Sequence, residues 1–159
     1  MFTIPSSSIG ILIIAGIINV VWVLLYLYAL ESDETTVVVP LFQTIPVFSF
    51  FLAWIILGET LSAKELMGAG IIVFGGVLLA VDIEKTKSGY SFKKKPFFLM
   101  IAASFLIGLL EVLFKSVTTI GTYWISNFWN YIGFTLAGLF ILFFITSYRR
   151  AFISMLKES

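Results

Sequence analysis

The amino-acid sequence predicts an all-α membrane protein, a polytopic bundle of five transmembrane helices. The chain of 159 residues is 60% hydrophobic and only 12% charged, whereas a soluble domain carries about 25% charged residues. Apolar runs near the length that spans a hydrocarbon core of about 30 Å recur along it. These runs do not alternate in polarity as the strands of a barrel do. Helices are therefore favoured, because they satisfy their own backbone hydrogen bonds in lipid.

The composition also excludes several classes of function. The sequence contains no cysteine and no histidine, which rules out disulfides, Cys/His zinc sites and acid–base chemistry by histidine. No paired carboxylates lie within the apolar runs, so we expect neither an enzyme nor a metal site. The net charge of +1 gives no indication of a nucleic-acid partner. The beginning, "MFTIPSSSIG", lacks the basic region and cleavage site of a signal peptide.

Five apolar segments account for the five expected helices. In order, they are 9–30, 36–57, 66–81, 97–117 and 123–147. The first is uninterrupted, the second holds two prolines, and the third is short but can be extended through Ser62 and Ala63. The fourth contains an acidic residue, and the fifth begins in a cluster of aromatic residues. Short polar segments connect them, and the longest, "DIEKTKSGYSFKKKP", is the expected boundary between two parts of the chain.

The resulting domain organisation has four parts. Residues 1–83 carry three helices, 84–96 form a basic linker, 97–148 carry two helices, and 149–159 form a charged tail that leaves the membrane. Lysine and arginine in short loops favour the cytoplasmic side. By parity the linker and the tail lie on the same side, with the residues Lys85, Lys87, Lys93, Lys94, Lys95, Arg149, Arg150 and Lys157. The charge distribution alone therefore places the linker and the C-terminus in the cytoplasm.

Glu111, in "IGLLEVLFKSV", is the first candidate functional residue. It lies fourteen residues into the fourth span, about 21 Å from its start, where a carboxylate is costly and faces a cavity or a partner. Ser104, Gly108, Glu111 and Lys115 fall on one stripe of this helix, which indicates a face packed against protein. Glu111 could couple transport to protons or bind substrate. Alternatively, Glu111 and Lys115 could form a structural charge pair at i, i+4, or Lys115 could extend to the interface.

Polar and aromatic residues of the fifth and first spans are further candidates. Asn127 and Asn130 share one face of the fifth span among aromatic residues, which suits either an amphiphilic substrate or helix packing. The fourth and fifth spans are joined by a short link, so we expect Glu111 to reach Asn127 or Asn130 at similar depth. In the first span Asn19, Trp22 and Tyr26 share a face, for which core packing is the simpler interpretation.

The two prolines of the second span indicate an interrupted helix. Pro40 and Pro46 each remove a backbone donor and free a carbonyl group, which lipid tolerates only where protein or a water-filled cavity satisfies it. Transporters use such interrupted helices at binding sites and hinges. We expect the helix to be kinked or loosened near one proline, with Gln43 facing protein or a cavity. A kink without function is the alternative.

The stretch "PLFQTIPVFSFFLAWIILGETLSAKELMGAGIIVFGGVLLAV" resembles the EamA-type repeat of the drug/metabolite transporter superfamily. The family pattern is a proline-bearing helix that ends in Leu-Gly-Glu, a short loop and a glycine-rich helix. Pro46, Gly58 and Glu59 match it here, together with Gly68 and the run Gly75-Gly76-Val77. "FLIGLLEVLFKSV" resembles the opening helix of a second repeat, which often ends in a lysine such as Lys115. The position of Glu59 at a helix end suggests capping or loop structure more than contact with substrate.

The resemblance implies a secondary transporter that moves small metabolites, amino acids or drugs by alternating access, without ATP or a cofactor. The family architecture is ten helices in two inverted repeats, which would place the linker outside the cell, against its lysines. Because Leu-Gly-Glu occurs once, we expect the chain to be the central portion of a carrier. Its expected partners are the lipid bilayer of the plasma membrane, a small-molecule substrate, and the missing remainder of the carrier or a second copy in a homodimer. The alternative is a non-transporting scaffold or assembly subunit, in which Glu111 and Asn127 pack helices.

Overall fold

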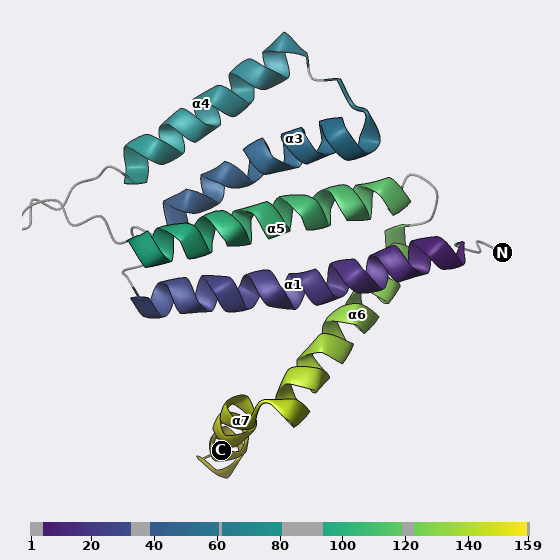
Figure 1. Ribbon diagram of the computed structural model, residues 1–159, viewed down its shortest axis with the longest axis vertical. Coiled ribbons are helices and arrows are strands. Elements are labelled where there is room, and N and C mark those ends of the chain that lie inside the picture. Colours follow the sequence, from purple (N-terminus) through teal and green to yellow (C-terminus); the bar gives the residue numbers. More distant parts are fainter. Residues whose placement is uncertain (1–4, 33–38, 61, 81–93, 119–122, 159) are drawn as a thin grey trace, which may run out of the picture. The chain divides into compact units, whose positions relative to one another are not determined.

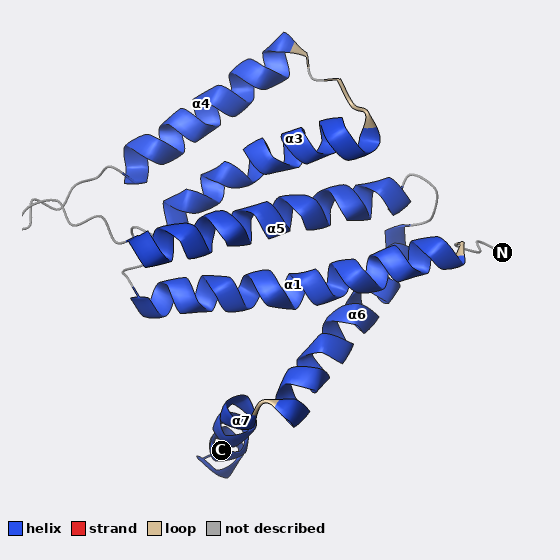
Figure 2. Ribbon diagram, in the orientation of Figure 1, coloured by secondary structure: helices blue, strands red, loops and turns tan. Residues whose placement is uncertain are grey.

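The structure of the chain is a computed structural model that describes residues 5–32, 39–60, 62–80, 94–118 and 123–158. Every regular element within these ranges is helical, and they contain no strand (Figure 2). In chain order the elements are α1 (Ser6–Ser32), the 3₁₀ helix η1 (Val39–Thr44), α3 (Ile45–Leu57), α4 (Ala63–Ala80), α5 (Lys94–Thr118), α6 (Tyr123–Phe144) and α7 (Thr146–Glu158) (Figure 1). The prediction of an all-α protein is confirmed for these residues.

Three of the described helices are long and apolar enough to cross a membrane. The qualifying segments are Ser6–Glu31, Lys95–Thr118 and Tyr123–Phe144, and a further apolar helix, Leu41–Leu57, is shorter. A helix of the structure therefore lies in each of the five expected segments, but only three of the five meet the length and hydropathy of a span. The number of five transmembrane helices stays a prediction.

The ends of the elements differ by up to three residues from the expected spans: α1 covers Ser6–Ser32 instead of 9–30, and α6 ends at Phe144 instead of 147. Two further differences concern the charged segments. Helix α5 begins at Lys94, inside the expected basic linker, whose residues 84–93 lie outside the described ranges. Lysine side chains can extend toward water, so a helix can continue past the apolar segment. The expected charged tail forms helix α7, separated from α6 at Ile145.

The chain divides into two compact units. The terminal unit comprises Met1–Val20 and Leu113–Ser159, and the central unit comprises Val21–Val112. Two clusters of buried side chains hold the central unit together. The first contains Ala29 and Met100 with Tyr26, Leu30, Leu41, Phe42 and Leu99 around them. The second contains Leu52, Ala53 and Val112 with Leu57 and Leu109. Both clusters combine residues of α5 with residues of other helices of this unit.

The proline-bearing segment of the central unit changes helix type along its length. Pro40 lies in the 3₁₀ helix η1, and Pro46 lies in the first turn of α3. A proline is tolerated there because its missing N–H group has no partner within the helix. The segment is therefore a short 3₁₀ helix followed by an α-helix, rather than one continuous α-helix.

The Leu-Gly-Glu motif ends α3, and a capping box begins α4. Gly58 has φ 66° and ψ 20°, and its N–H group donates to the carbonyl of Ala53. Only glycine adopts this left-handed conformation without strain. Ser62 and Glu65 then form a reciprocal pair: the Ser62 N–H group donates to Glu65 Oε2 at 2.8 Å, and the Glu65 N–H group donates to Ser62 Oγ at 3.3 Å. This pair satisfies donors at the start of α4.

The terminal unit contains a close crossing of α1 and α6 at two glycines. A Cβ atom added to Gly16 would collide with the backbone oxygen of Asn130 and lie 2.6 Å from the backbone nitrogen of Phe134. A Cβ atom added to Gly133 would collide with the carbonyl oxygen of Ile13. The two backbones approach each other closely because neither glycine carries a side chain.

Candidate functional site

The carboxylate of Glu111 and the hydroxyl of Ser49 form the centre of the candidate site, which lies within the central unit. Ser49 Oγ donates a hydrogen bond of 2.6 Å to Glu111 Oε2. Ser49 is in the first half of α3, and Glu111 is in the second half of α5. The bond thus connects the proline-interrupted segment to the acidic residue of the fourth expected span.

The approach of α3 to α5 depends on Gly108. A Cβ atom added there would lie 2.9 Å from the backbone nitrogen of Ser49 and 3.1 Å from Phe48 Cβ. One helical turn separates Gly108 from Glu111, so the same face of α5 carries the contact and the carboxylate. The glycine therefore allows the hydroxyl of Ser49 to reach Glu111.

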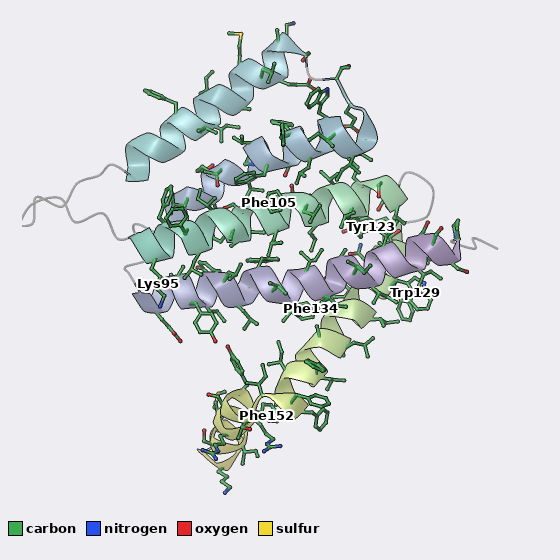
Figure 3. The ribbon with its side chains drawn as sticks, in the orientation of Figure 1. Lys95, Phe105, Tyr123, Trp129, Phe134 and Phe152 are labelled. Atoms are coloured by element: carbon green, nitrogen blue, oxygen red, sulfur yellow. The ribbon has the colours of Figure 1, made fainter. Side chains whose placement is uncertain are left out.

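Side chains nearer the start of α5 continue this contact. Ser104 is fully buried, and its hydroxyl donates to the carbonyl of Leu41 in η1 at 3.3 Å. Phe105, labelled in Figure 3, makes an edge-to-face contact with Phe48, with ring centroids 5.6 Å apart. The stripe formed by Ser104, Gly108 and Glu111 thus packs against η1 and α3. The hydroxyl of Ser104 satisfies the carbonyl group of Leu41 in the interrupted segment.

The carboxylate of Glu111 combines a short hydrogen bond with access. Glu111 is also exposed among the described residues, so its carboxylate remains accessible from one side.

The other residues predicted around Glu111 belong to the terminal unit. The predicted contact of Asn127 and Asn130 with Glu111 therefore stays untested. The charge pair of Glu111 with Lys115 likewise stays a prediction. Sequence reasoning missed Ser49 as a partner of Glu111. The available signal was its position on α3 three residues after Pro46, but no pattern in the sequence links that position to α5.

An aromatic cluster accounts for two residues of the first span. Phe42 of η1 contacts Tyr26 with ring centroids 5.2 Å apart and Trp22 at 6.4 Å. Both contacts belong to the central unit and fit the packing interpretation. Gln43, next to Phe42, is exposed. The prediction that it faces protein or a cavity therefore gains no support from the described residues around it. Asn19 is half-buried in the terminal unit.

Two buried polar groups lie beside the glycine crossing of the terminal unit. Ser126 and Asn130 are 0% and 6% exposed, and neither Ser126 Oγ nor Asn130 Nδ2 has a hydrogen-bond partner among the described residues. Gly133 follows on the same face of α6. Asn127 instead donates from its Nδ2 to the carbonyl of Tyr123 at 3.2 Å, one turn earlier in the same helix.

A shallow depression of about 240 Å³ lies along α6. All of its lining residues belong to this one helix: Phe128, Tyr131, Ile132, Thr135 and Leu136. It is therefore a groove on a helix surface rather than a cavity between helices. Within the described ranges, no group of three acidic residues is arranged to hold a metal ion.

The long apolar helices and the composition define the class of protein, an integral membrane protein built of α-helices. The model of the EamA-like transporter family matches residues 1–81, just over half of the chain. The protein therefore belongs to the EamA-like transporter family, which is a family of transporters rather than enzymes. Neither a curated protein nor a solved structure matches the chain.

Proposed function

We propose that the protein acts in secondary transport, moving small metabolites, amino acids or drugs across the plasma membrane by alternating access. Membership in the EamA-like transporter family supports transport as the general activity. The hydrogen bond between Ser49 and Glu111 is the observation that carries the mechanism. It connects an intramembrane carboxylate, which is rare unless it has a function, to an interrupted helix of the kind that moves in transporters.

The proposed mechanism acts through the charge of Glu111, which strengthens the hydrogen bond from Ser49. With Glu111 ionised, the hydroxyl of Ser49 holds α3 against α5. Binding of a proton or of a cationic substrate group at Glu111 weakens this bond and releases α3. Pro40 and Pro46 define the point at which α3 can then move, because the change from 3₁₀ to α-helix leaves the backbone bonds there less regular. Within the central unit, Gln43 is the further polar group proposed to line the pathway, and the roles of Asn127 and Asn130 stay predictions for the terminal unit.

The experiment compares Glu111→Gln with the unchanged residue in the full-length carrier, reconstituted into vesicles. Glutamine keeps the size and the acceptor oxygen of the side chain but removes its charge. Uptake of ethidium and of a mixture of radiolabelled amino acids is measured with and without a proton gradient, and a trapped pH dye records proton movement. We expect Glu111→Gln to insert normally and to lose gradient-driven uptake. Unchanged uptake with an unchanged response to the gradient would contradict the role of Glu111.

A scaffold without transport is the second candidate. The observation in its favour is the local hydrogen bond of Asn127 to Tyr123, which gives this residue a role within its own helix. In that case, neither ethidium nor amino acids would be moved even in vesicles that contain many copies of the chain together with any further helices of the carrier. Glu111→Gln would then lower the free energy of unfolding, and uptake would be absent both before and after the substitution.

A further inference from the structure

We propose that α7 is an interfacial helix that lies in the plane of the membrane and binds the anionic headgroups of phospholipids. This inference concerns a surface that the transport proposal does not use. It depends on the length of α6, on the distribution of side chains around α7 and on the charge of α7.

The position of α7 follows from α6. Helix α6 has 22 residues, which corresponds to a length of about 33 Å at 1.5 Å per residue. That length matches a hydrocarbon core of about 30 Å, so the end of α6 at Phe144 reaches the membrane surface. Tyr123 and Trp124, both exposed at the opposite end, have the character of an aromatic belt at the other surface. Helix α7 begins at Thr146 and therefore starts at the interface.

The length of α7 excludes a second crossing. Its 13 residues reach about 20 Å, too short for the hydrocarbon core. The backbone is interrupted at Ile145, although the Ile145 N–H group still donates to Ile141 and the Arg149 N–H group donates to Ile145. The two helices are thus joined by a single residue, and Figure 1 shows α7 turned away from the axis of α6. The helix can lie along the membrane surface.

Most of the large apolar side chains of α7 lie on one face, and Ile153 is the exception, because it lies toward the basic residues. Tyr148, Phe152 and Met155 recur at i, i+4 and i+7 and share one face. Phe152, labelled in Figure 3, is 45% exposed, and Met155 is 64% exposed. Large apolar side chains thus point outward from the described residues. The opposite face carries Arg150 and Lys157, which are seven residues apart.

The charge of α7 selects anionic lipid rather than a neutral surface. The helix contains Arg149, Arg150 and Lys157 against the single acidic residue Glu158. Basic residues on the polar side of an amphipathic helix attract anionic lipids, and the apolar side enters the boundary between headgroups and acyl chains by about 5–10 Å. Each basic residue near such a surface contributes about 1 kcal/mol, or a factor of about five in binding.

The first test measures the depth of α7 on the full chain. Because the sequence contains no cysteine, Met155→Cys and Ser154→Cys each introduce a single site for a spin label, the first on the apolar face and the second about 100° around the helix toward Arg150. The protein is reconstituted into vesicles of phosphatidylcholine with one-third phosphatidylglycerol. We expect the label at 155 to be reached by oxygen and shielded from a water-soluble nickel complex, and the label at 154 to show the reverse. Two labels in water, or a label at 155 shielded from both reagents as under a protein partner, would overturn the proposal.

The second test measures the part played by charge. The double variant Arg149→Gln/Arg150→Gln, combined with the label at 155, should reduce the ratio of bound to free α7 by more than tenfold in the anionic vesicles. Arg150→Lys is the matched control and should leave it unchanged, because lysine keeps the charge. Replacing phosphatidylglycerol with phosphatidylcholine should lower the ratio of bound to free α7 as the double variant does. An unchanged ratio in the double variant would show that anionic headgroups are not what α7 binds.

Discussion

The hydroxyl group of Ser49 makes a hydrogen bond between two helices of the central unit, α3 and α5. It is the donor to the carboxylate of Glu111 at 2.6 Å, and it lies where Gly108 brings α5 close to α3. Hydrogen bonds between membrane helices contribute only about 0.6 kcal/mol on average. The bond is therefore too weak to hold the fold, but it is strong enough to bias the position of one helix. Such a weak contact suits a step that must be reversed in each transport cycle.

Ser49→Ala should therefore change transport more than stability. We expect the free energy of unfolding to fall by about 0.6 kcal/mol, and by no more than about 1.7, while the dependence of uptake on the proton gradient changes clearly. Ser116→Ala is the control, because the hydroxyl of Ser116 donates to Leu113 within α5 itself. Unfolding is followed in detergent by tryptophan fluorescence. A gradient dependence equal to that of the unchanged protein would reduce Ser49 to a packing residue.

Two helices far apart in the sequence cross at glycines in the terminal unit. Neither Gly16 of α1 nor Gly133 of α6 has room for a Cβ atom, and in both cases the obstacle is backbone of the other helix. A flexible side chain could move aside, but backbone can yield only if the helices separate. The crossing is therefore intolerant of even a single methyl group.

Gly16→Ala and Gly133→Ala should each lower the free energy of unfolding by about 1–3 kcal/mol, the usual cost of overpacking. The same helices offer matched controls. A Cβ atom at Gly10 of α1 or at Gly138 of α6 meets nothing within 4 Å. Alanine at these two positions should be neutral or stabilising by up to about 1 kcal/mol, because it favours the helix. Equal melting temperatures for all four variants would contradict the close crossing.

The elements were predictable to different degrees for physical reasons. Hydropathy located α1, α5 and α6, since their length and composition follow from the thickness of the bilayer. It did not locate the start of α5 at Lys94, because water and lipid both permit a charged first turn. Helix α7 was not predicted, because its charged residues lower the mean hydropathy of the segment. The spacing of Tyr148, Phe152 and Met155 is nevertheless that of one helix face. Pro40 and Pro46 predicted an interruption, and η1 is the form it takes.

The candidate site was predictable in part. The cost of a charge in lipid identified Glu111, and the stripe through Ser104 and Gly108 indicated the face of α5 that packs on protein. The identity of the partner, Ser49, could not be read from one sequence, since 62 residues separate the two positions. Contacts of this kind depend on how helices pack, and the apolar residues of α3 are nearly interchangeable in a sequence pattern.

At the scale of the whole molecule, we propose that more helices than the three described spans surround the pathway of the carrier. The family architecture supplies two repeats around one pathway, from further helices of the carrier or from a second copy. We therefore expect no uptake by the 159-residue chain when vesicles contain at most one copy each, counted by single-molecule photobleaching. Uptake that appears only as the number of copies rises would indicate a homodimer. Uptake by single copies would contradict the need for a partner.

The crossing of α1 with α6 also sets an order of events during synthesis. Gly133 follows Gly16 by 117 residues (133 minus 16). A ribosome that adds about 5–20 residues per second needs roughly 6–23 seconds to make that stretch. For most of this interval α1 has been synthesised, and its glycine face has no α6 to contact. The nascent chain thus exposes a smooth helix face that only the later synthesis of α6 can cover.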